Sequence, residues 1–408
     1  MAKEIVIIGC GMGSAESMTG KAQKALKSAQ LIFGPERLTR ALAGTQQRVK
    51  QGYQVQDLLT LLRETTEEKI AVLVSGDSGF YSAASIYAKQ LAEAQENYSV
   101  QICPGISSLS YLAACTAQSW GDAAIYSLHG RAQNYYRSLC SGEKFAMLGG
   151  NGFTEVLQEL CDRGFGGSEV WIGEQLGSAD EKICYGMAEK LCAEKTDPLS
   201  LMLVLPKGTD KVLRSFGIAE EEFVRGDVPI TKSEVRAVTM SRLCVGNRDV
   251  VYDIGAGTGS VSVECSIAAA YGEVYAIEQN EKALSLIVEN KRKFLCRNLN
   301  IVPGMAPEVL DNLPVPDKVF IGGSKGKMPE ILSLLLKKNP KVHVVINVTA
   351  LETLQETLQA LEQLGYTEAE ISQVAVSKAI KRGRYHMMEG LNPVYVITAD
   401  GRAGAETI

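Results

Sequence analysis

The segment around residues 250–260 constrains the fold of this chain more than any other. A β-rich run, Val250 to Ile254, leads directly into GAGTGS, and a helical pattern, Val261 to Ala270, follows. A glycine-rich turn between a strand and a helix lets the backbone approach a ligand at the helix N-terminus. The spacing is GxGxG with Asp253 two residues before it, and not the GxGxxG of a dinucleotide site. The turn is therefore too tight for a pyrophosphate and suits a ligand without one.

The strand after this loop carries a carboxylate at its end. Val274 to Ile277 read as that strand, and Glu278 follows, 23 residues beyond Gly255. A carboxylate in this position can accept hydrogen bonds from both hydroxyls of a ribose. A purely structural turn is the alternative interpretation of the glycines. The combination of the strand, Asp253 and Glu278 favours S-adenosylmethionine binding over that alternative.

The periodicity divides the 408 residues into two halves. Residues 1–206 alternate β-rich runs, glycine-rich loops and helical patterns, and residues 229–408 begin the same alternation again. Between them, residues 207–228 lack a regular pattern and are predicted to be a linker. The alternation indicates an α/β fold with mostly parallel sheets. In residues 145–205 strand follows strand more often, which predicts a second, mixed sheet.

Both ends of the second half have signals of their own. Thr231 to Glu234 read TKSE, a capping box that would begin a helix through Leu243. Near the C-terminus, the β-rich runs Ile371 to Ala379 and Pro393 to Ile397 enclose only a short connection. We therefore expect these two strands to pair antiparallel at the edge of the sheet.

The charge and the cysteine pattern exclude several functions. The net charge is −5, and neither half is basic, so nucleic-acid binding through a positive field is not expected. The 10 Cys form no CxxC pair, and the 3 His complete no cluster with the spacing of a metal site. Reduced thiols in a cytoplasmic protein are the expectation. No apolar run reaches the roughly 18–20 residues that cross a membrane.

Several segments of the second half resemble the decarboxylating precorrin methyltransferase domain of cobalamin synthesis. They are DVPITKSEVRAVTMSRL at 227–243, the glycine loop, GMAPEVL at 304–310, FIGGSKGKMPEIL at 320–332, INVTALETL at 346–354 and RYHMMEGLNPVYVI at 384–397. The resemblance implies a Rossmann-like class I methyltransferase fold with S-adenosyl-L-methionine as cofactor. It also implies the residues that contact this cofactor: Thr231, Gly255, Ala256, Gly257, Thr258, Gly259, Glu278 and Ala306.

The first half is similar to the class III tetrapyrrole methylases, in which two α/β subdomains hold the cofactor in the cleft between them. The matching segments are GCGMGS at 9–14, SMTGKA at 17–22, LIFGPER at 31–37, SGDSGFYS at 75–82, PGISSLSYLAA at 104–114 and DPLSLMLVL at 197–205. Met12 departs from the family pattern, which has proline there, so the rigidity of this loop is in doubt. The resemblance implies cofactor contacts at Asp77, Phe80, Ser107 and Ser108. It implies substrate contacts in the first loop, at Gly9, Cys10 and Gly11.

Together the two resemblances imply a bifunctional enzyme. Residues 1–206 would methylate carbon 5 of precorrin-6B or its cobalt form, and residues 229–408 would methylate carbon 15 and decarboxylate the ring C acetate. The expected partner is this small-molecule tetrapyrrole, without nucleic acid or membrane, and the expected assembly is a homo-oligomer. The alternatives are a fused pair of methyltransferases acting on another substrate and a cofactor-sensing protein without activity. No catalytic residue and no metal ligand is assigned.

The carboxylates of such a substrate need cations on an otherwise acidic protein. The run from 378 to 384 offers four of them and no acid: Lys378, Lys381, Arg382 and Arg384. A charged edge strand that blocks sheet extension is the alternative. With the family resemblance, the run is predicted to bind substrate carboxylates, and Lys325 and Lys327, in the glycine loop after Ile321, are expected to add to this surface. His129, Arg131 and His386 lie in loop-like contexts and are added as substrate contacts, whereas His343 is expected in the core.

Overall fold

The structure, a computed structural model, describes residues 3–94, 96–128, 133–208 and 214–402. Its contacts form two compact units. Unit 1 contains Met1–Ile125 and Glu143–Gly208, and unit 2 contains Tyr126–Gly142 and Thr209–Ile408. The units therefore cannot be separated by one cut in the sequence. The assignment of one activity to residues 1–206 and another to residues 229–408 stays a prediction.

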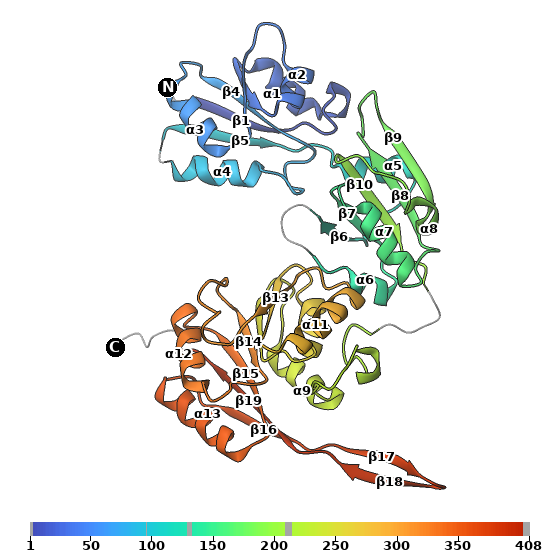
Figure 1. The fold of residues 1–408 in the computed structure, drawn as a ribbon. Helices are drawn as coiled ribbons and strands as arrows, with labels where there is room; N and C mark the ends of the chain where they lie inside the picture. Colours follow the sequence, from blue (N-terminus) through green and yellow to red (C-terminus); the bar gives the residue numbers. More distant parts are fainter. Residues whose placement is uncertain (1–2, 95, 129–132, 209–213, 403–408) are drawn as a thin grey trace. The chain divides into compact units, whose positions relative to one another are not determined.

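The first sheet of unit 1 is parallel, as the strand–helix alternation predicts (Figure 1). Its order is β3-β2-β4-β1-β5. The strands are β1 (Lys3–Gly9), β2 (Leu31–Gly34), β3 (Arg48–Gln51), β4 (Lys69–Val74) and β5 (Tyr98–Cys103). The helices are η1 (Ala15–Ser17), α1 (Gly20–Ser28), α2 (Glu36–Leu42), α3 (Val55–Glu64) and α4 (Ala84–Glu93). β1 is buried on both faces, because Ile7 and Ile8 belong to two different hydrophobic clusters.

Unit 1 also contains a second sheet, separate from the first. The second sheet predicted for residues 145–205 is thus confirmed. Its order is β6-β7-β10-β8-β9, and the pairs β7–β10, β8–β10 and β8–β9 are antiparallel. The strands are β6 (Ala124–Ser127), whose last two residues belong to unit 2, β7 (Phe145–Leu148), β8 (Glu169–Glu174), β9 (Lys182–Met187) and β10 (Ser200–Leu205). The helices are α5 (Ser108–Thr116), α7 (Phe153–Asp162) and α8 (Ala188–Leu191). Met12, from the loop after β1, is buried in the hydrophobic cluster of this second sheet.

Unit 2 contains a seven-stranded sheet with the order β13-β12-β11-β14-β15-β19-β16. Its five leading strands are mutually parallel, and β19 runs antiparallel to both β15 and β16. The strands are β11 (Val250–Ile254), β12 (Glu273–Glu278), β13 (Leu299–Pro303), β14 (Lys318–Ile321), β15 (His343–Val348), β16 (Glu370–Val374) and β19 (Val394–Asp400). The predicted parallel sheet with an antiparallel C-terminal edge is confirmed.

The helices of unit 2 are α6 (Tyr136–Ser141), η2 (Glu220–Glu222), α9 (Ser233–Leu243), α10 (Ser260–Ala268), α11 (Glu281–Lys293), α12 (Met328–Lys338) and α13 (Leu351–Gln363). The capping box expected at the start of α9 is wrong. Lys232 is the N-cap residue, and its side chain does not cap the helix; the N–H of Ser233 instead donates to the Glu220 carboxylate at 3.5 Å. The Glu234 carboxylate instead pairs with Lys378 at 3.2 Å.

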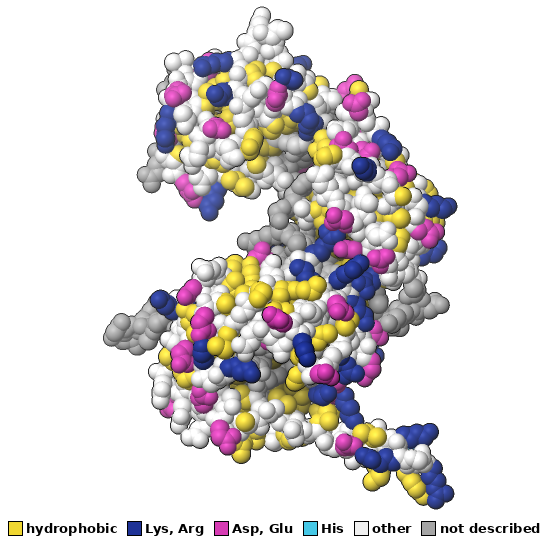
Figure 2. Space-filling view, viewed as in Figure 1, with side chains coloured by type: hydrophobic (Ala, Val, Ile, Leu, Met, Phe, Trp, Pro, Cys, Tyr) yellow, Lys and Arg dark blue, Asp and Glu magenta, His cyan; other side chains and the backbone are white. Residues whose placement is uncertain are grey.

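The connection before β19 is also longer than the sequence suggests. The expected strand from Ile371 to Ala379 ends as β16 at Val374, and β17 (Ser377–Arg382) then pairs with β18 (Tyr385–Gly390) in a separate two-stranded sheet. We call β17 and β18 the arm, which extends beyond the seven-stranded sheet (Figure 1). Hydrophobic side chains are exposed on it among Lys and Arg (Figure 2), namely Ile380, Tyr385, Met387 and Met388.

Residues 126–142 come from the middle of the first half of the sequence but pack in unit 2. The Tyr126 ring stacks on Tyr271, with centroids 5.7 Å apart. The Asn134 side chain is fully buried and donates to the Ser266 hydroxyl at 3.0 Å, and its backbone N–H donates to the Ala270 carbonyl at 3.0 Å. The unit built on the second half therefore requires a segment of the first.

The end of the predicted linker, residues 214–228, is also part of unit 2. Ile218 and Phe223 are buried in it, and the N–H of Ile218 donates to Glu264 at 3.0 Å. Arg236 is fully buried and pairs with the same carboxylate at 2.7 Å. Arg236 also donates to the Ile218 carbonyl, and its guanidinium lies 4.8 Å from the centroid of the Phe223 ring. This stretch is therefore not a free linker, because a buried ion pair and apolar contacts fix it.

Asp253, at the end of β11, is completely buried. Its Oδ2 accepts a hydrogen bond from the Ser262 hydroxyl of α10, whereas Oδ1 has no partner among the described residues. Burial raises the pKa of this carboxyl to about 7. Asp253 therefore joins the strand to the helix that follows the glycine loop, and it does so most favourably as a neutral acid.

A carboxyl group whose pKa is raised by folding gives unit 2 a pH-dependent stability. Its contribution is complete below the unfolded pKa of about 3.9 and is lost as the pH rises through 7. Asp253→Asn imitates the neutral acid and should remove this loss. Measured by calorimetry, the unfolding temperature of the variant relative to the wild type should rise by about 5–11 °C between pH 5 and pH 8. An offset that is equal at both pH values would contradict this assignment.

Candidate active site

A cavity of about 570 Å³ lies at the carboxyl ends of the parallel strands of unit 2. The end of each strand from β11 to β15, or the loop after it, contributes to the wall. The lining residues are 228–232, Val235, 254–257, 277–280, Ala283, 304–306, Phe320, 322–325, Asn347, Thr349 and Val394. In an open parallel sheet this is the edge at which ligands bind.

The glycines of the 255–259 loop are required by its conformation. Gly255, Gly257 and Gly259 have φ values of 76°, 58° and 76°, which residues with a side chain rarely adopt. A Cβ on Gly255 would lie 2.9 Å from the backbone nitrogen of Gly323, and one on Gly257 would lie 3.2 Å from the Pro229 carbonyl oxygen. Both neighbours line other parts of the cavity. The loop thus packs backbone to backbone against two further walls of the same cavity.

The structure brings together six of the eight residues that the second half was predicted to use for the cofactor. Thr258 is buried and Gly259 packs against Ile287, so neither lines the cavity. The six that line it are Thr231, Gly255, Ala256, Gly257, Glu278 and Ala306.

The carboxylate of Glu278 is fixed by the backbone around it. Its Oε2 accepts from the N–H of Gly257 at 2.9 Å. Its Oε1 accepts from the N–H groups of Gln279 at 2.9 Å and Asn280 at 2.8 Å. An ionised carboxylate has about four acceptor positions, so one remains on Oε2. Glu278 therefore holds the glycine loop and still offers an acceptor to a ligand in the cavity.

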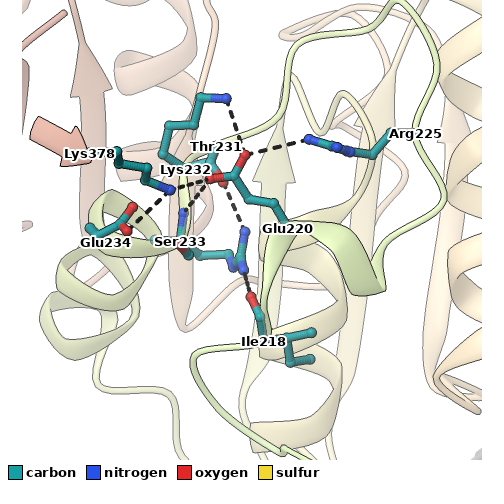
Figure 3. A network of polar contacts seen from close by, with 9 residues as sticks. Ile218, Glu220, Arg225, Thr231, Lys232, Ser233, Glu234 and Lys378 are labelled. Atoms are coloured by element: carbon teal, nitrogen blue, oxygen red, sulfur yellow. Dashed lines mark hydrogen bonds and ion pairs between the residues drawn. The ribbon is translucent and has the colours of Figure 1, made fainter. Parts of the chain in front are cut away.

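A second carboxylate, Glu220, holds the wall formed by residues 228–232 (Figure 3). Its side chain is 6% exposed and pairs with Lys232 at 3.1 Å, Lys378 at 3.2 Å and Arg225 at 3.6 Å. Burial alone would raise the pKa of Glu220, but the bonds from Lys232 and Lys378 lower it below its ordinary value. The base of the arm, at Lys378, is therefore tied to the cavity wall through a charged carboxylate.

The buried Arg236 fixes the same wall from inside. Its Nη1 donates to the carbonyl oxygen of Thr231 at 2.8 Å. Since Thr231 lines the cavity, a side chain from α9 sets the position of the cavity wall. Thr231 itself is brought to the predicted site, but through its backbone and not through a capping box.

Of the described cations predicted to bind substrate, Lys325 lines the cavity, whereas Lys327 and the cations of the arm do not. Lys378 is already paired with Glu220 and Glu234. On the arm, Arg382 pairs with Glu389 at 3.3 Å, and the Arg384 guanidinium lies 4.9 Å from the centroid of the Tyr385 ring. Lys381 and His386 are both exposed, and they lie opposite each other on the two paired strands of the arm.

In unit 1, the loops after β1, β4 and β5 meet at three glycines. A Cβ on Gly9 would lie 2.6 Å from the backbone nitrogen of Gly105, and one on Gly105 would lie 2.2 Å from the Gly76 carbonyl oxygen. Gly11 and Gly76 form a short antiparallel bridge. Because these residues have no side chains, the ends of three neighbouring strands come into backbone contact.

The residues predicted to bind the cofactor in unit 1 lie on these loops or beside them. The Asp77 carboxylate accepts from the N–H groups of Gly79 at 2.8 Å and Gly105 at 3.1 Å, so it links the loops after β4 and β5. Ser107 is buried and caps α5, which begins at Ser108. Phe80 packs against the hydrophobic cluster of the second sheet.

Cys10 does not present its thiol as a substrate contact would. It is completely buried, its Sγ lies 3.4 Å from the Ile8 carbonyl oxygen, and burial raises its pKa to about 12. His129 and Arg131, two other predicted substrate contacts, lie outside the described residues. The ring of His343 places Nδ1 2.7 Å from an Asp400 carboxylate oxygen and Nε2 2.9 Å from the Arg242 carbonyl oxygen.

The described ranges lack two kinds of feature. No helix there is both long and apolar enough to cross a membrane. No three or more His, Cys, Asp or Glu side chains in those ranges gather in a way that could hold a metal ion.

Sequence reasoning missed several residues of the cavity wall. They are Lys232, Asn280, Met305, Phe320, Asn347 and Thr349. Most of them lie at or just beyond the carboxyl end of a parallel strand of the seven-stranded sheet. The signal that could have found them is therefore the strand end itself, since the ends of neighbouring parallel strands meet at one edge.

Two protein families match separate parts of the chain. Residues 222–400 match the family described as a precorrin methyltransferase domain, and residues 4–192 match the tetrapyrrole (corrin/porphyrin) methylases. A crystal structure of precorrin-6Y C5,15-methyltransferase from Geobacter metallireducens GS-15 has 42% identity and a TM-score of 0.44. It covers 46% of this chain and 98% of that one.

Two curated relatives show how far the similarity extends. The probable cobalt-precorrin-6B C(15)-methyltransferase (decarboxylating) of Pyrobaculum calidifontis is 41% identical over 186 residues, which are 45% of this chain and 95% of the relative. The precorrin-6Y C(5,15)-methyltransferase [decarboxylating] of a Sinorhizobium species is 28% identical over 331 residues, 78% of each chain. This chain therefore belongs to the precorrin methyltransferase family through its second half, and residues 4–192 of its first half match the tetrapyrrole methylases.

Proposed function

We propose that this protein is a bifunctional S-adenosylmethionine-dependent methyltransferase of corrin ring synthesis. Residues 229–408 methylate carbon 15 of precorrin-6B, or of its cobalt form, and release the ring C acetate carboxyl as carbon dioxide. Residues 1–206 methylate carbon 5. The observation that carries the proposal is that each unit has its own glycine-lined strand ends, within a segment that matches its own methyltransferase family.

The relatives support both activities in one chain. The name of the Sinorhizobium relative gives both carbons and the decarboxylation, and its match extends through 78% of this chain. The name of the Pyrobaculum relative gives the carbon-15 activity, and 95% of that protein is matched. The substrate in both cases is a tetrapyrrole. A homo-oligomer and a cytoplasmic location belong to the same proposal.

The cavity of unit 2 fits S-adenosylmethionine, which supplies an activated methyl group when bound. The free acceptor position on Glu278 suits a ribose hydroxyl, and Ile277 and Ala306 give an apolar wall for the base. The 255–257 backbone is the part of the wall that a ligand can approach most closely. In unit 1, Asp77, Phe80, Ser107 and Ser108 are proposed to serve the same cofactor.

For this reaction the protein chiefly has to position the ring carbon and the methyl donor relative to each other. An electron-rich ring carbon must meet an already activated methyl group in line, and a fixed orientation can supply most of the rate. Glu220 and Arg236 supply that rigidity in unit 2, because they hold the 228–232 wall through an ion-pair cluster and a buried hydrogen bond. Decarboxylation is favoured by the electron demand of the methylated, cationic ring.

The first test of the cofactor site is Glu278→Ala. The variant loses the ribose acceptor and the bond to the Gly257 N–H, so S-adenosylhomocysteine should bind unit 2 more weakly by about 1.5–3 kcal/mol. Carbon-15 methylation should fall at limiting cofactor, while carbon-5 methylation survives. Glu281→Ala, three residues further on and outside the cavity wall, is the matched control and should change neither. Equal loss of both methylations would contradict the assignment.

The second test is the number of cofactor sites. If each unit binds S-adenosylmethionine independently, calorimetric titration of the full chain with S-adenosylhomocysteine should give a stoichiometry near two. Titration of the Glu278→Ala variant should retain one of these sites at its original affinity. A stoichiometry near one for the folded wild-type chain would refute the two-site proposal.

The third test concerns the arm, where Lys381, Arg382, Arg384 and His386 are proposed to meet peripheral carboxylates of the tetrapyrrole. Arg382→Gln combined with Arg384→Gln should raise KM for the tetrapyrrole about two- to thirtyfold, since each exposed charge contact contributes roughly 0.2–1 kcal/mol. The wild-type KM should also rise with salt. An unchanged KM with altered solubility would show that these cations only protect an exposed strand edge.

A further inference from the structure

The loop between β14 and α12, residues 322–327, forms the part of the cavity wall next to the glycine loop. Gly322, Gly323, Ser324 and Lys325 line the cavity. A Cβ on Gly255 would lie 2.9 Å from the Gly323 nitrogen, so the two loops are in backbone contact. Whatever lies on this loop therefore lies beside the proposed cofactor. This is the place that a methyl acceptor has to reach.

Gly323 is a glycine that the protein itself does not require. A Cβ added there would meet no atom within 4 Å, and its φ is outside the left-handed region. By contrast, a Cβ on Gly322 would lie 3.1 Å from the Phe320 ring, and Gly326 has a φ of 77°. The missing side chain at 323 therefore leaves open space in the cavity wall, next to the loop that is proposed to bind the cofactor.

Lys325 is strained and without a partner. Its φ is 52°, a left-handed conformation that costs a residue with a side chain about 1 kcal/mol or more. It is exposed at the cavity, and the described part of the chain offers it no ion pair or side-chain hydrogen bond. Lys232, the other lysine among the described lining residues, is paired with Glu220. Lys327, two positions further along the loop, is paired with Glu308.

We propose that Gly323 and Lys325 form a substrate subsite, in which the tetrapyrrole face lies over Gly323 and the Lys325 ammonium binds one of its peripheral carboxylates. The proposal rests on the proposed function of unit 2 and adds the residues that select its substrate. The open space suits a flat macrocycle, and an unpaired cation beside it suits an anionic rim. The cost of the Lys325 backbone is understandable if that conformation directs the ammonium to a ligand.

The test of the cation uses the full chain, saturating S-adenosylmethionine and precorrin-6B, with carbon-15 methylation as the readout. Lys325→Gln and Lys325→Gly should each raise KM for the tetrapyrrole about three- to tenfold, with kcat within about twofold. The glycine variant separates charge from backbone, because glycine adopts the same φ without strain. Lys325→Arg should keep a near-normal KM. Lys327→Gln, the matched control, should leave KM unchanged.

The test of the open space is Gly323→Ala. Since no protein atom lies near the added Cβ, the unfolding temperature and the affinity for S-adenosylhomocysteine should match the wild type. KM for the tetrapyrrole should rise, because the methyl group enters the space that we assign to the macrocycle. An unchanged KM in this variant would overturn the assignment of Gly323.

The failures of the two proposals can be told apart. If the wild-type chain methylates carbon 15 but Lys325→Gln or Lys325→Gly has an unchanged KM, the cation assignment is wrong and the function stands. If Lys325→Arg loses as much as Lys325→Gln, the effect is not one of charge and the assignment is also wrong. If the wild-type chain does not methylate the tetrapyrrole at carbon 15, the proposed function fails, and the subsite fails with it.

Discussion

The fully buried ion pair between Arg236 and Glu264 is the interaction on which the cavity of unit 2 depends. Two charges removed from water are costly, and they are tolerated only when further hydrogen bonds satisfy them. These further bonds go to other segments: the guanidinium donates to the Thr231 and Ile218 carbonyls, and Oε1 of the carboxylate accepts from the Ile218 N–H. The other carboxylate oxygen, Oε2, has no partner among the described residues. The need to satisfy one buried pair thereby joins α9, α10, the segment before η2 and the cavity wall.

The sequence was most informative where the functional residues are close together in the chain. The 255–259 glycines and Glu278 could be predicted because a strand, a tight turn and the next strand end have a fixed spacing. Asn347 could not, because it reaches the cavity from a strand whose only local signal is a hydrophobic run. The prediction of a capping box was wrong for a related reason. Glu234 pairs with Lys378, which is remote in sequence, and a four-residue motif carries no information about this pairing.

The fold was predicted well where the hydrophobic periodicity is strong and poorly where packing partners are distant. Most parallel strands of both units were found from their β-rich runs, but β3 was not, because all four of its residues are exposed and form no hydrophobic run. The arm was not, because residues 377–390 mix exposed hydrophobic and basic side chains and follow no core pattern. Residues 126–142 were not placed in unit 2 either. Their anchors, such as Tyr126 on Tyr271 and Asn134 on Ser266, join positions more than 130 residues apart.

The crossing of residues 126–142 into unit 2 has a consequence for how this enzyme could be divided. The chain passes between the units three times, so no single cleavage point yields two complete globules. A fragment that starts near residue 207 would keep the seven-stranded sheet but would uncover Tyr271 and leave Ser266 without the Asn134 amide. The complementary fragment would carry the Tyr126 and Asn134 side chains with nothing to bury them. Unit 2 therefore takes part of its buried surface from a segment of the first half. Gene fission would require other residues to cover Tyr271 and Ser266.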